Sequence, residues 1–166
     1  IAEREQSHRG AMKDPDSSAY TFAYFVDVAG REIDKARRHD RRFALVTLGL
    51  ESGEDEAVAP GGAGVQVVER VLGAVRDTDV LARVDENEFY LLLPETGGIG
   101  AHACRRRIMR ELGVLGRAGG EAGEIGRISI GVATFPHDGT DLSQLLRVAK
   151  HRADVSSCSV VQRGGR

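Results

Sequence analysis

Apolar residues recur along the chain with two different periods, and their alternation predicts a domain that mixes helices and strands. Where apolar side chains return every three to four residues, we expect an amphipathic helix. Where they form short runs rich in strand-forming residues, we expect a buried strand. The predicted helices cover residues 19–38, 65–76, 99–112 and 141–153. The predicted strands cover residues 43–50, 79–84, 88–93, 128–135 and 159–162.

The connections between these segments favour a split βαββαβ arrangement. Three polar residues, Asp85-Glu86-Asn87, separate two of the strands, which is the spacing of a β-hairpin. Residues 51–64 are acidic and then rich in glycine, so they are a predicted loop. Residues 113–126 hold six glycines and are predicted to be a loop or a short edge hairpin. The sequence therefore predicts an α+β fold with a central, mainly antiparallel sheet of about five strands flanked by helices.

The composition fits one domain and excludes several classes of partner. The chain has 166 residues with 23 Lys and Arg against 25 Asp and Glu, a net charge of −2 that offers no field to attract nucleic acid. Two cysteines make no disulfide framework and favour a reduced, cytoplasmic compartment. No apolar run approaches the roughly 20 residues of a membrane span. We predict that residues 1–13 are a linker helix from an upstream domain and that residues 14–163 are the domain itself.

Several segments in a fixed order carry a resemblance to a known family. They are Asp14 and Phe25 near the N-terminus, the run from Arg76 to Arg83, the hairpin Asp85-Glu86-Asn87-Glu88-Phe89 and the strand residues 128–135 (ISIGVATF). In this order the chain resembles a GGDEF domain, the bacterial module that makes cyclic di-GMP from two GTP molecules. The resemblance implies the nucleotidyl-cyclase-like palm, a ferredoxin-like βαββαβ fold, in which the hairpin is a degenerate form of the family's signature.

The resemblance also implies an active site with two Mg²⁺ ions, and this chain lacks the carboxylates that would hold them. Mg²⁺ prefers oxygen ligands and is bound through carboxylates and substrate phosphates. The family's ligand positions fall at Gly49, which has no side chain, and at Asn87, whose amide is neutral. Glu51 and Glu88 remain nearby in the sequence, but they do not replace the two missing carboxylates. We therefore expect no bound metal and no cofactor.

Other parts of the family's active site are altered as well. Asp85 and Glu86 replace the two glycines that let the hairpin backbone approach the nucleotide, which adds bulk and negative charge. The segment of residues 49–61 is short for the family, and Ala57 stands near the place of the guanine-reading asparagine. Residues 153–161 (ADVSSCSVV) lack the family's phosphate-binding lysine. We predict that the chain has no catalytic residues and is not an enzyme.

A second nucleotide site of the family, the inhibitory site or I-site, keeps its motif in this chain. In the family, the R-x-x-D sequence of that site begins nine residues before the signature. Here Arg76 lies nine residues before Asp85, and Asp79 completes the motif. A further arginine follows eighteen residues after the signature phenylalanine, which gives Arg107 after Phe89. An arginine can donate two hydrogen bonds to the O6/N7 edge of guanine, and a carboxylate can accept from its N1–H and 2-amino group. We predict that these two arginines and the aspartate bind cyclic di-GMP.

Short motifs also occur by chance, and two further R-x-x-D sequences are present. Arg31 with Asp34 and Arg37 with Asp40 both fall in the first predicted helix, and we interpret them as surface ion pairs. The distance of Arg76 from the signature hairpin distinguishes it from these pairs.

These observations favour a non-catalytic cyclic di-GMP receptor in bacterial signal transduction. Its expected partners are cyclic di-GMP, an upstream sensory or effector domain of the same chain, and a second copy of the chain. Two alternatives remain open. One is a weakly active diguanylate cyclase that uses Glu51 and Glu88 as surrogate metal ligands. The other is a protein–protein interaction module without a ligand. We expect a cytoplasmic location, with no nucleic acid partner and no membrane segment in this part of the chain.

Overall fold

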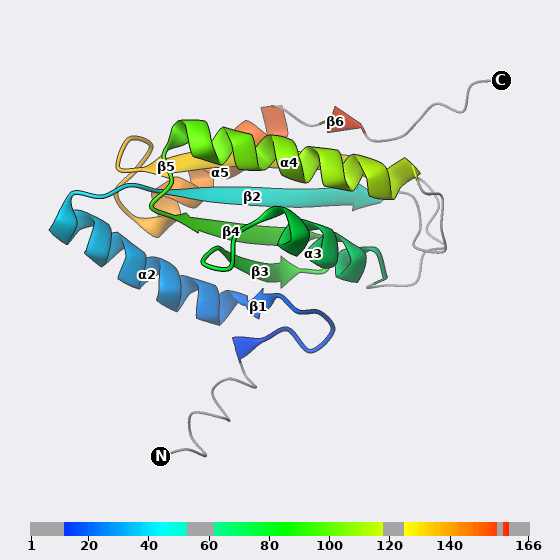
Figure 1. Ribbon diagram of the computed structural model, residues 1–166, viewed down its shortest axis with the longest axis horizontal. Coiled ribbons are helices and arrows are strands. Elements are labelled where there is room, and N and C mark those ends of the chain that lie inside the picture. The colour runs from blue at the N-terminus through cyan, green and yellow to red at the C-terminus, as the bar shows by residue number, and fades with distance from the viewer. Residues whose placement is uncertain (1–11, 53–61, 118–124, 156–157, 160–166) are drawn as a thin grey trace, which may run out of the picture.

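One mixed β-sheet runs through the residues that the computed structural model describes, namely 12–52, 62–117, 125–155 and 158–159 (Figure 1). The strand order is β1-β3-β4-β2-β5-β6, so the long strand β2 lies between β4 and β5. The strands are β1 (Tyr20–Thr21), β2 (Phe43–Ser52), β3 (Val80–Asp85), β4 (Glu88–Pro94), β5 (Ile125–Phe135) and β6 (Cys158–Ser159).

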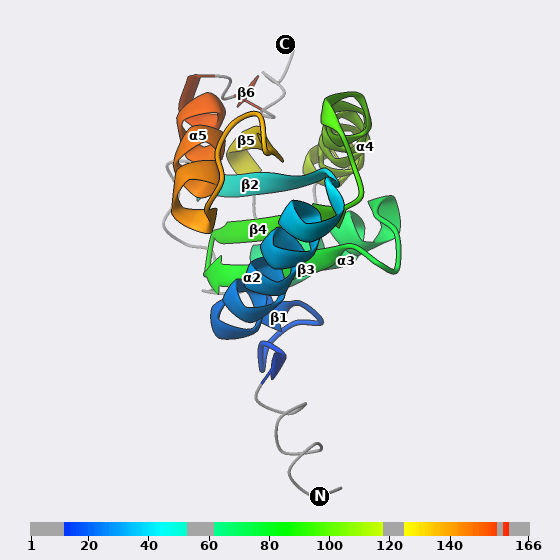
Figure 2. The ribbon, with the colours of Figure 1, turned by 90° about the vertical axis from the view of Figure 1, so that its left-hand side faces the viewer.

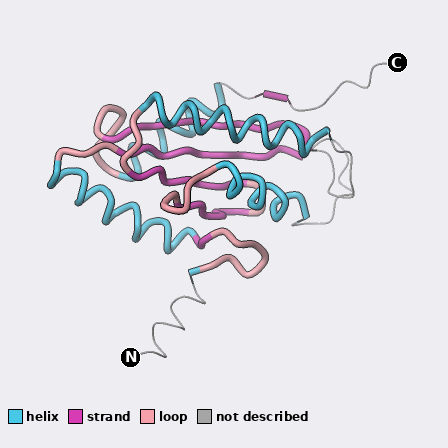
Figure 3. Tube along the Cα trace, viewed as in Figure 1, coloured by secondary structure: helices cyan, strands magenta, loops and turns pink. Residues whose placement is uncertain are grey.

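The four long strands are antiparallel, as the sequence predicts. β2 pairs with β4 on one side and with β5 on the other, and β3 and β4 form the predicted hairpin. At the two edges, β1 pairs in parallel with β3 and β6 pairs antiparallel with β5. The tube in Figure 3 shows the strands side by side between the helices. The architecture is the predicted α+β palm, with a mixed sheet.

The helices cover both faces of this sheet. α3 and α4 pack on one face, and α2 and α5 pack on the other. Figure 2 shows α4 and α5 on opposite sides of the sheet. The helices are α2 (Phe22–His39), α3 (Gly62–Ala74), α4 (Gly98–Arg117) and α5 (Leu142–Val155).

Alternating side chains of β2 divide the core into two layers. Phe43 and Leu45 pack with α2 and α5, whereas Ala44 and Val46 pack with α3 and α4. Successive side chains of a strand point to opposite faces, so a strand covered on both faces is apolar at nearly every position, and Thr47 is the buried polar exception in β2. This explains the continuous apolar run that predicts the strand.

The first helix begins three residues later than predicted, at Phe22 rather than residue 19. The cause is the two-residue strand β1, which the sequence analysis missed and which pairs Tyr20 with Ala82 of β3. Thr21 then ends the extended stretch and caps the helix, with its hydroxyl oxygen accepting from the backbone N–H of Tyr24 at 3.3 Å. Pairing with a distant strand therefore outweighs the local helical spacing here.

The glycine-rich segment 113–126 is only partly the loop or edge hairpin predicted for it. α4 continues through residue 117, and β5 begins at residue 125. A glycine in a helix costs about 1 kcal/mol relative to alanine, which weakens a helix without ending it. β6 occupies residues 158–159 and so begins one residue before the predicted start at 159, while residues 160–162 of that prediction lie outside the described residues. Residues 1–11, 53–61, 118–124, 156–157 and 160–166 lie outside the described residues, so most of the predicted linker helix and Ala57 are outside them too.

A half-buried carboxylate, that of Asp138, holds the turn between β5 and α5. Asp138 forms two hydrogen bonds with Arg152, at 2.8 and 2.9 Å, and accepts from the backbone N–H of Thr134 at 2.8 Å. Arg152 also donates to the Val132 carbonyl oxygen at 2.9 Å. The hydrogen bonds from Arg152, followed by those from Thr134, lower the pKa of Asp138 from 3.8 to about 2.

We expect Asp138→Asn to lower the free energy of unfolding at pH 7 by up to about 2 kcal/mol. The reason is that the folded state stabilises the ionised form of the Asp138 carboxyl group, which the lowered pKa reflects. The contribution is fully present above the unfolded pKa of 3.8 and is lost as the pH falls towards 2. Urea unfolding at pH 7 and at pH 3 measures the difference between wild type and variant, which should shrink at pH 3.

A matched control is Asp27→Asn, which removes an exposed ion pair with Arg31. Exposed pairs of this kind contribute about 0.5 kcal/mol or less. An Asp138→Asn effect that is as small as the control, or independent of pH, would contradict the role assigned to this turn.

Candidate functional site

Arg76 and Asp79 form a tight corner between α3 and β3. The backbone N–H of Arg76 donates to the Asp79 carboxylate at 2.8 Å, and the backbone N–H of Asp79 donates to the Arg76 carbonyl oxygen at 3.0 Å. The corner buries the Asp79 side chain, which is 2% exposed. Its Oδ1 atom has no hydrogen-bond partner among the described residues. A buried carboxylate oxygen without a donor is costly, so this atom is a candidate acceptor for a ligand.

The Arg76 side chain extends along the wall of a pocket beside this corner. Its guanidinium Nη2 donates to the Thr96 hydroxyl oxygen at 2.7 Å and lies 3.6 Å from Asp79 Oδ1. The side chain remains 59% exposed. No hydrogen bond within the described part of the chain uses its Nε or Nη1 atoms, so those donors face solvent or a ligand.

Arg107 reaches the same pocket from α4. Its Nε donates to the carbonyl oxygen of Ala74, the last residue of α3, at 3.2 Å. The pocket has a volume of about 380 Å³, and Arg76, Asp79, Thr96, Cys104 and Arg107 are among its lining residues. The structure thus brings together the three residues predicted to bind cyclic di-GMP, from two elements that are far apart in the sequence.

Cys104 packs in the core beneath this pocket and has 2% of its surface exposed. Burial raises the pKa of its thiol. The thiol is therefore protonated and unreactive at neutral pH.

The two other R-x-x-D sequences do not form the predicted ion pairs. Arg31 pairs with Asp27 at 3.1 Å instead of with Asp34. Arg37 donates to the Thr140 carbonyl oxygen, and Asp40 takes the left-handed conformation that ends α2. The residues of both sequences are exposed, on the surface or at the end of α2, whereas the Asp79 side chain is buried.

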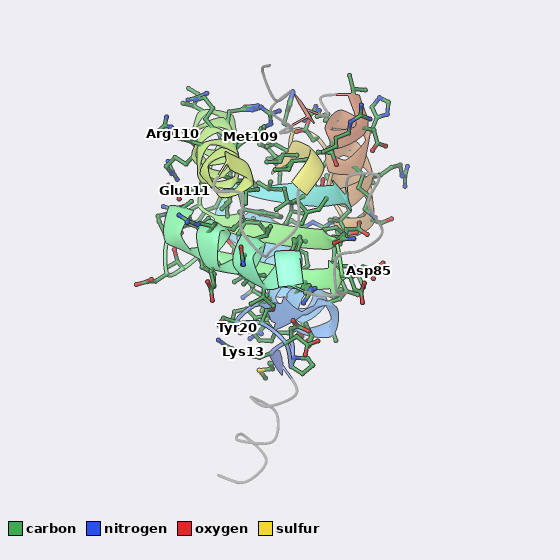
Figure 4. The ribbon with its side chains drawn as sticks, turned by 90° about the vertical axis from the view of Figure 1, so that its right-hand side faces the viewer. Lys13, Tyr20, Asp85, Met109, Arg110 and Glu111 are labelled. Carbon is green, nitrogen blue, oxygen red and sulfur yellow. The ribbon has the colours of Figure 1, made fainter. Side chains whose placement is uncertain are left out.

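The signature hairpin lines a second pocket, on the face of the sheet that α5 covers. Figure 4 shows Asp85 on the opposite side of the molecule from Arg110 and Glu111 of α4. This pocket has a volume of about 460 Å³. Its lining residues are Thr47, Leu48, Gly49, Leu50, Asp85, Glu86, Asn87, Glu88, Ser129, Lys150, Ala153 and Asp154.

A lysine of α5 neutralises the hairpin glutamate inside this second pocket. Lys150 Nζ lies 3.0 Å from Glu88 Oε1, and the Tyr90 hydroxyl donates to the same oxygen at 3.1 Å. Hydrogen bonding to Tyr90 and then to Glu88 raises the pKa of Lys150. Burial raises the pKa of Tyr90. Sequence reasoning missed this cluster because Lys150 lies sixty-two residues after Glu88 in the chain.

The described side chains of the second pocket do not fit the two Mg²⁺ ions that the resemblance implies, and the side chain of Glu51 lies outside the described residues. Gly49 has no side chain that could act as a metal ligand, and a Cβ atom at this position would lie 2.8 Å from Ser129 Oγ. The Asn87 side chain is a neutral amide in place of a carboxylate, and the backbone carbonyl oxygen of Asn87 accepts from the backbone N–H of Leu50 at 2.8 Å. Glu88 is already paired with Lys150. Among the described residues, no group of three or more His, Cys, Asp or Glu is placed to hold a metal ion.

Within the described residues no helix has the length and apolar character needed to cross a membrane.

The chain belongs to the GGDEF domain family, because residues 65–156 match the family model described as the diguanylate cyclase GGDEF domain. This match covers more than half of the chain and includes all the lining residues of the first pocket and the hairpin and α5 residues of the second, whereas Gly49 lies before it. No curated protein matches the chain.

Solved structures of GGDEF domains share the fold at low sequence identity. The GGDEF domain of TpbB (YfiN) from Pseudomonas aeruginosa is 22% identical, with a TM-score of 0.73 over 86% of this chain and 87% of that one. The GGDEF domain of FimX from the same organism is 18% identical, with a TM-score of 0.72 over 87% and 93% of the two chains. The GGDEF domain of DgcB from Caulobacter crescentus, solved in complex with cyclic di-GMP, is 17% identical, with a TM-score of 0.65 over 88% and 85%.

Proposed function

We propose that this GGDEF domain does not convert GTP and that it binds cyclic di-GMP through Arg76, Asp79 and Arg107. The observation that carries the proposal is the first pocket, where an exposed arginine and a second arginine flank a buried carboxylate oxygen without a donor. The structure of the DgcB domain with cyclic di-GMP supports the choice of ligand. Binding would report the level of the second messenger to an attached or partner signalling domain.

The donors and acceptors of the first pocket suit a guanine base. The Arg76 guanidinium has free N–H groups for the O6/N7 edge, and Asp79 Oδ1 can accept from N1–H or the 2-amino group. Hydrogen bonds between a charged group and a ligand are about twice as strong as neutral ones. Arg107 adds a second positive charge for the ligand's phosphates at the same pocket.

The charge of the second pocket supports the absence of turnover. Four carboxylates, those of Asp85, Glu86, Glu88 and Asp154, line it against the single cation Lys150. A GTP triphosphate would be repelled by this charge, and no metal carboxylates are present at Gly49 and Asn87 to offset it. Transfer at a phosphate depends on positioning and charge stabilisation, and this pocket supplies neither.

Two assays test the proposal. Calorimetric titration with cyclic di-GMP should give saturable heat, and incubation with GTP and Mg²⁺ or Mn²⁺ should give no cyclic di-GMP by chromatography. Product formation would favour the weakly active cyclase. A flat titration together with no product would favour an interaction module without a ligand.

We expect the double variant Gly49→Asp, Asn87→Asp to remain inactive, although it restores two metal carboxylates. Asp85 and Glu86 would still repel the triphosphate, and Lys150 would still pair with Glu88. The new aspartate at residue 49 would also have to displace the Ser129 hydroxyl, which lies 2.8 Å from the position of its Cβ. Chromatography of GTP incubations with Mg²⁺ measures the outcome.

The control for this experiment is the same double variant with Asp85→Gly and Glu86→Gly added, which removes bulk and like charge together. Product from the double variant alone would show that the hairpin substitutions are compatible with catalysis, and would overturn the non-catalytic assignment.

A further inference from the structure

The first pocket contains a buried hydroxyl that neither the motif nor its spacing indicates. Thr96 lies between β4 and α4, is 9% exposed, and lines the pocket next to the Arg76 side chain. The preceding residue, Glu95, has a φ of 52° and turns the chain at this point. Glu95 is held in turn by ion pairs with Arg41 and Lys35, so Thr96 sits on a fixed corner.

The hydrogen bonds of the Thr96 hydroxyl have a defined direction. The hydroxyl has one proton, which it donates to the Pro94 carbonyl oxygen at 2.9 Å. Its oxygen is therefore an acceptor towards Arg76, whose Nη2 donates to it at 2.7 Å. The bond is charge-assisted, and the backbone of β4 orients it.

This contact fixes one end of the Arg76 guanidinium and leaves the other end available. Nη2 is held between Thr96 Oγ1 and Asp79, while Nε and Nη1 make no hydrogen bond within the described part of the chain. A long side chain that is 59% exposed would otherwise sample many rotamers, and ordering it on binding costs affinity.

We propose that Thr96 is a positioning residue of the cyclic di-GMP site, which holds the Arg76 guanidinium in the orientation that binds guanine. The inference rests on the proposed function, because it concerns the affinity for the same ligand. Thr96 acts through Arg76 and need not touch the ligand itself.

The test is calorimetric titration with cyclic di-GMP of the wild type and of four variants. Thr96→Val keeps the shape and removes the hydroxyl, and Thr96→Ala removes it without placing a methyl group against the Pro94 carbonyl. Both should weaken binding at least fivefold. Thr96→Ser keeps the hydroxyl and should bind within twofold of wild type. Thr140→Val, at an exposed threonine between β5 and α5 that does not line the first pocket, is the matched control and should also stay within twofold.

Melting temperatures separate positioning from folding. If Thr96→Val does not fold, Thr96→Ala takes its place in the comparison with Thr96→Ser. The inference fails if wild type binds and the hydroxyl-free variants bind within twofold of it, or if Thr96→Ser is as weak as they are. If wild type itself gives no heat, the proposed function fails, and the inference fails with it.

Discussion

Replacing Arg76 by alanine should weaken cyclic di-GMP binding more than a hundredfold and leave the domain folded. The variant loses two charge-assisted hydrogen bonds to guanine, each worth about 1.5–3 kcal/mol, and about 1.4 kcal/mol corresponds to a factor of ten in affinity. The fold should survive because the side chain is 59% exposed. The backbone N–H of Arg76, which bonds Asp79 at 2.8 Å, is also kept in the variant. Calorimetric titration and circular dichroism measure the two parts of this prediction.

The matched control is Arg31→Ala, which removes the arginine of another R-x-x-D sequence, on the surface of α2. This variant should bind cyclic di-GMP as wild type does. Binding by Arg76→Ala within twofold of wild type would show that the first pocket is not the ligand site.

Replacing Gly131 by alanine should cost the domain about 3 kcal/mol or more of stability, the upper end of the range for overpacked cores. A Cβ atom at this position of β5 would lie 1.7 Å from the Ala149 carbonyl oxygen and 2.6 Å from the Ala153 backbone nitrogen. Both atoms belong to the backbone of α5, which cannot move aside as a flexible side chain can. We expect the melting temperature to fall by about 10 °C, which thermal unfolding followed by circular dichroism measures.

A second glycine provides the control. Gly73 lies in α3 with no atom within 4 Å of a Cβ built on it. Gly73→Ala should therefore be neutral, or stabilising by up to about 1 kcal/mol through better helix propensity. If the melting temperature of Gly131→Ala stayed within about 2 °C of wild type, the close approach of β5 and α5 would be contradicted. A shift of that size is well below the one expected for such a clash.

Features with a local cause were predictable from the sequence. The hairpin at residues 85–87 follows from polar residues between two apolar runs, and β2 follows from an apolar segment buried on both faces. The start of α5 also has a local cause, since the Asp141 carboxylate accepts from the backbone N–H of Gln144 at 2.8 Å and so caps the helix. In each case the information lies within a few neighbouring residues.

Features that depend on distant partners were not predictable in this way. β1 exists because Tyr20 and Thr21 pair with Ala82 and Arg83, far along the chain, and two residues carry no pattern of their own. The contact between Lys150 and Glu88 likewise requires α5 to pack beside the hairpin.

The residues of the candidate site also differ in how far the sequence could predict them. The spacing of Arg76, Asp79 and Arg107 from the signature predicted a shared site, and the three line one pocket. The contact of Thr96 with Arg76 could not be predicted, because a threonine after Pro94 and Glu95 indicates only a turn. Its role depends on the geometry that brings the end of β4 to the corner between α3 and β3.

The most direct test of the account is calorimetric titration of the wild-type chain with cyclic di-GMP, with GTP as the comparison ligand. We predict saturable heat for cyclic di-GMP, loss of that heat in Arg76→Ala, and no saturable heat for GTP at the acidic second pocket. No detectable heat for cyclic di-GMP at ligand concentrations of about 50 μM, where sites of micromolar affinity would be filled, would contradict it.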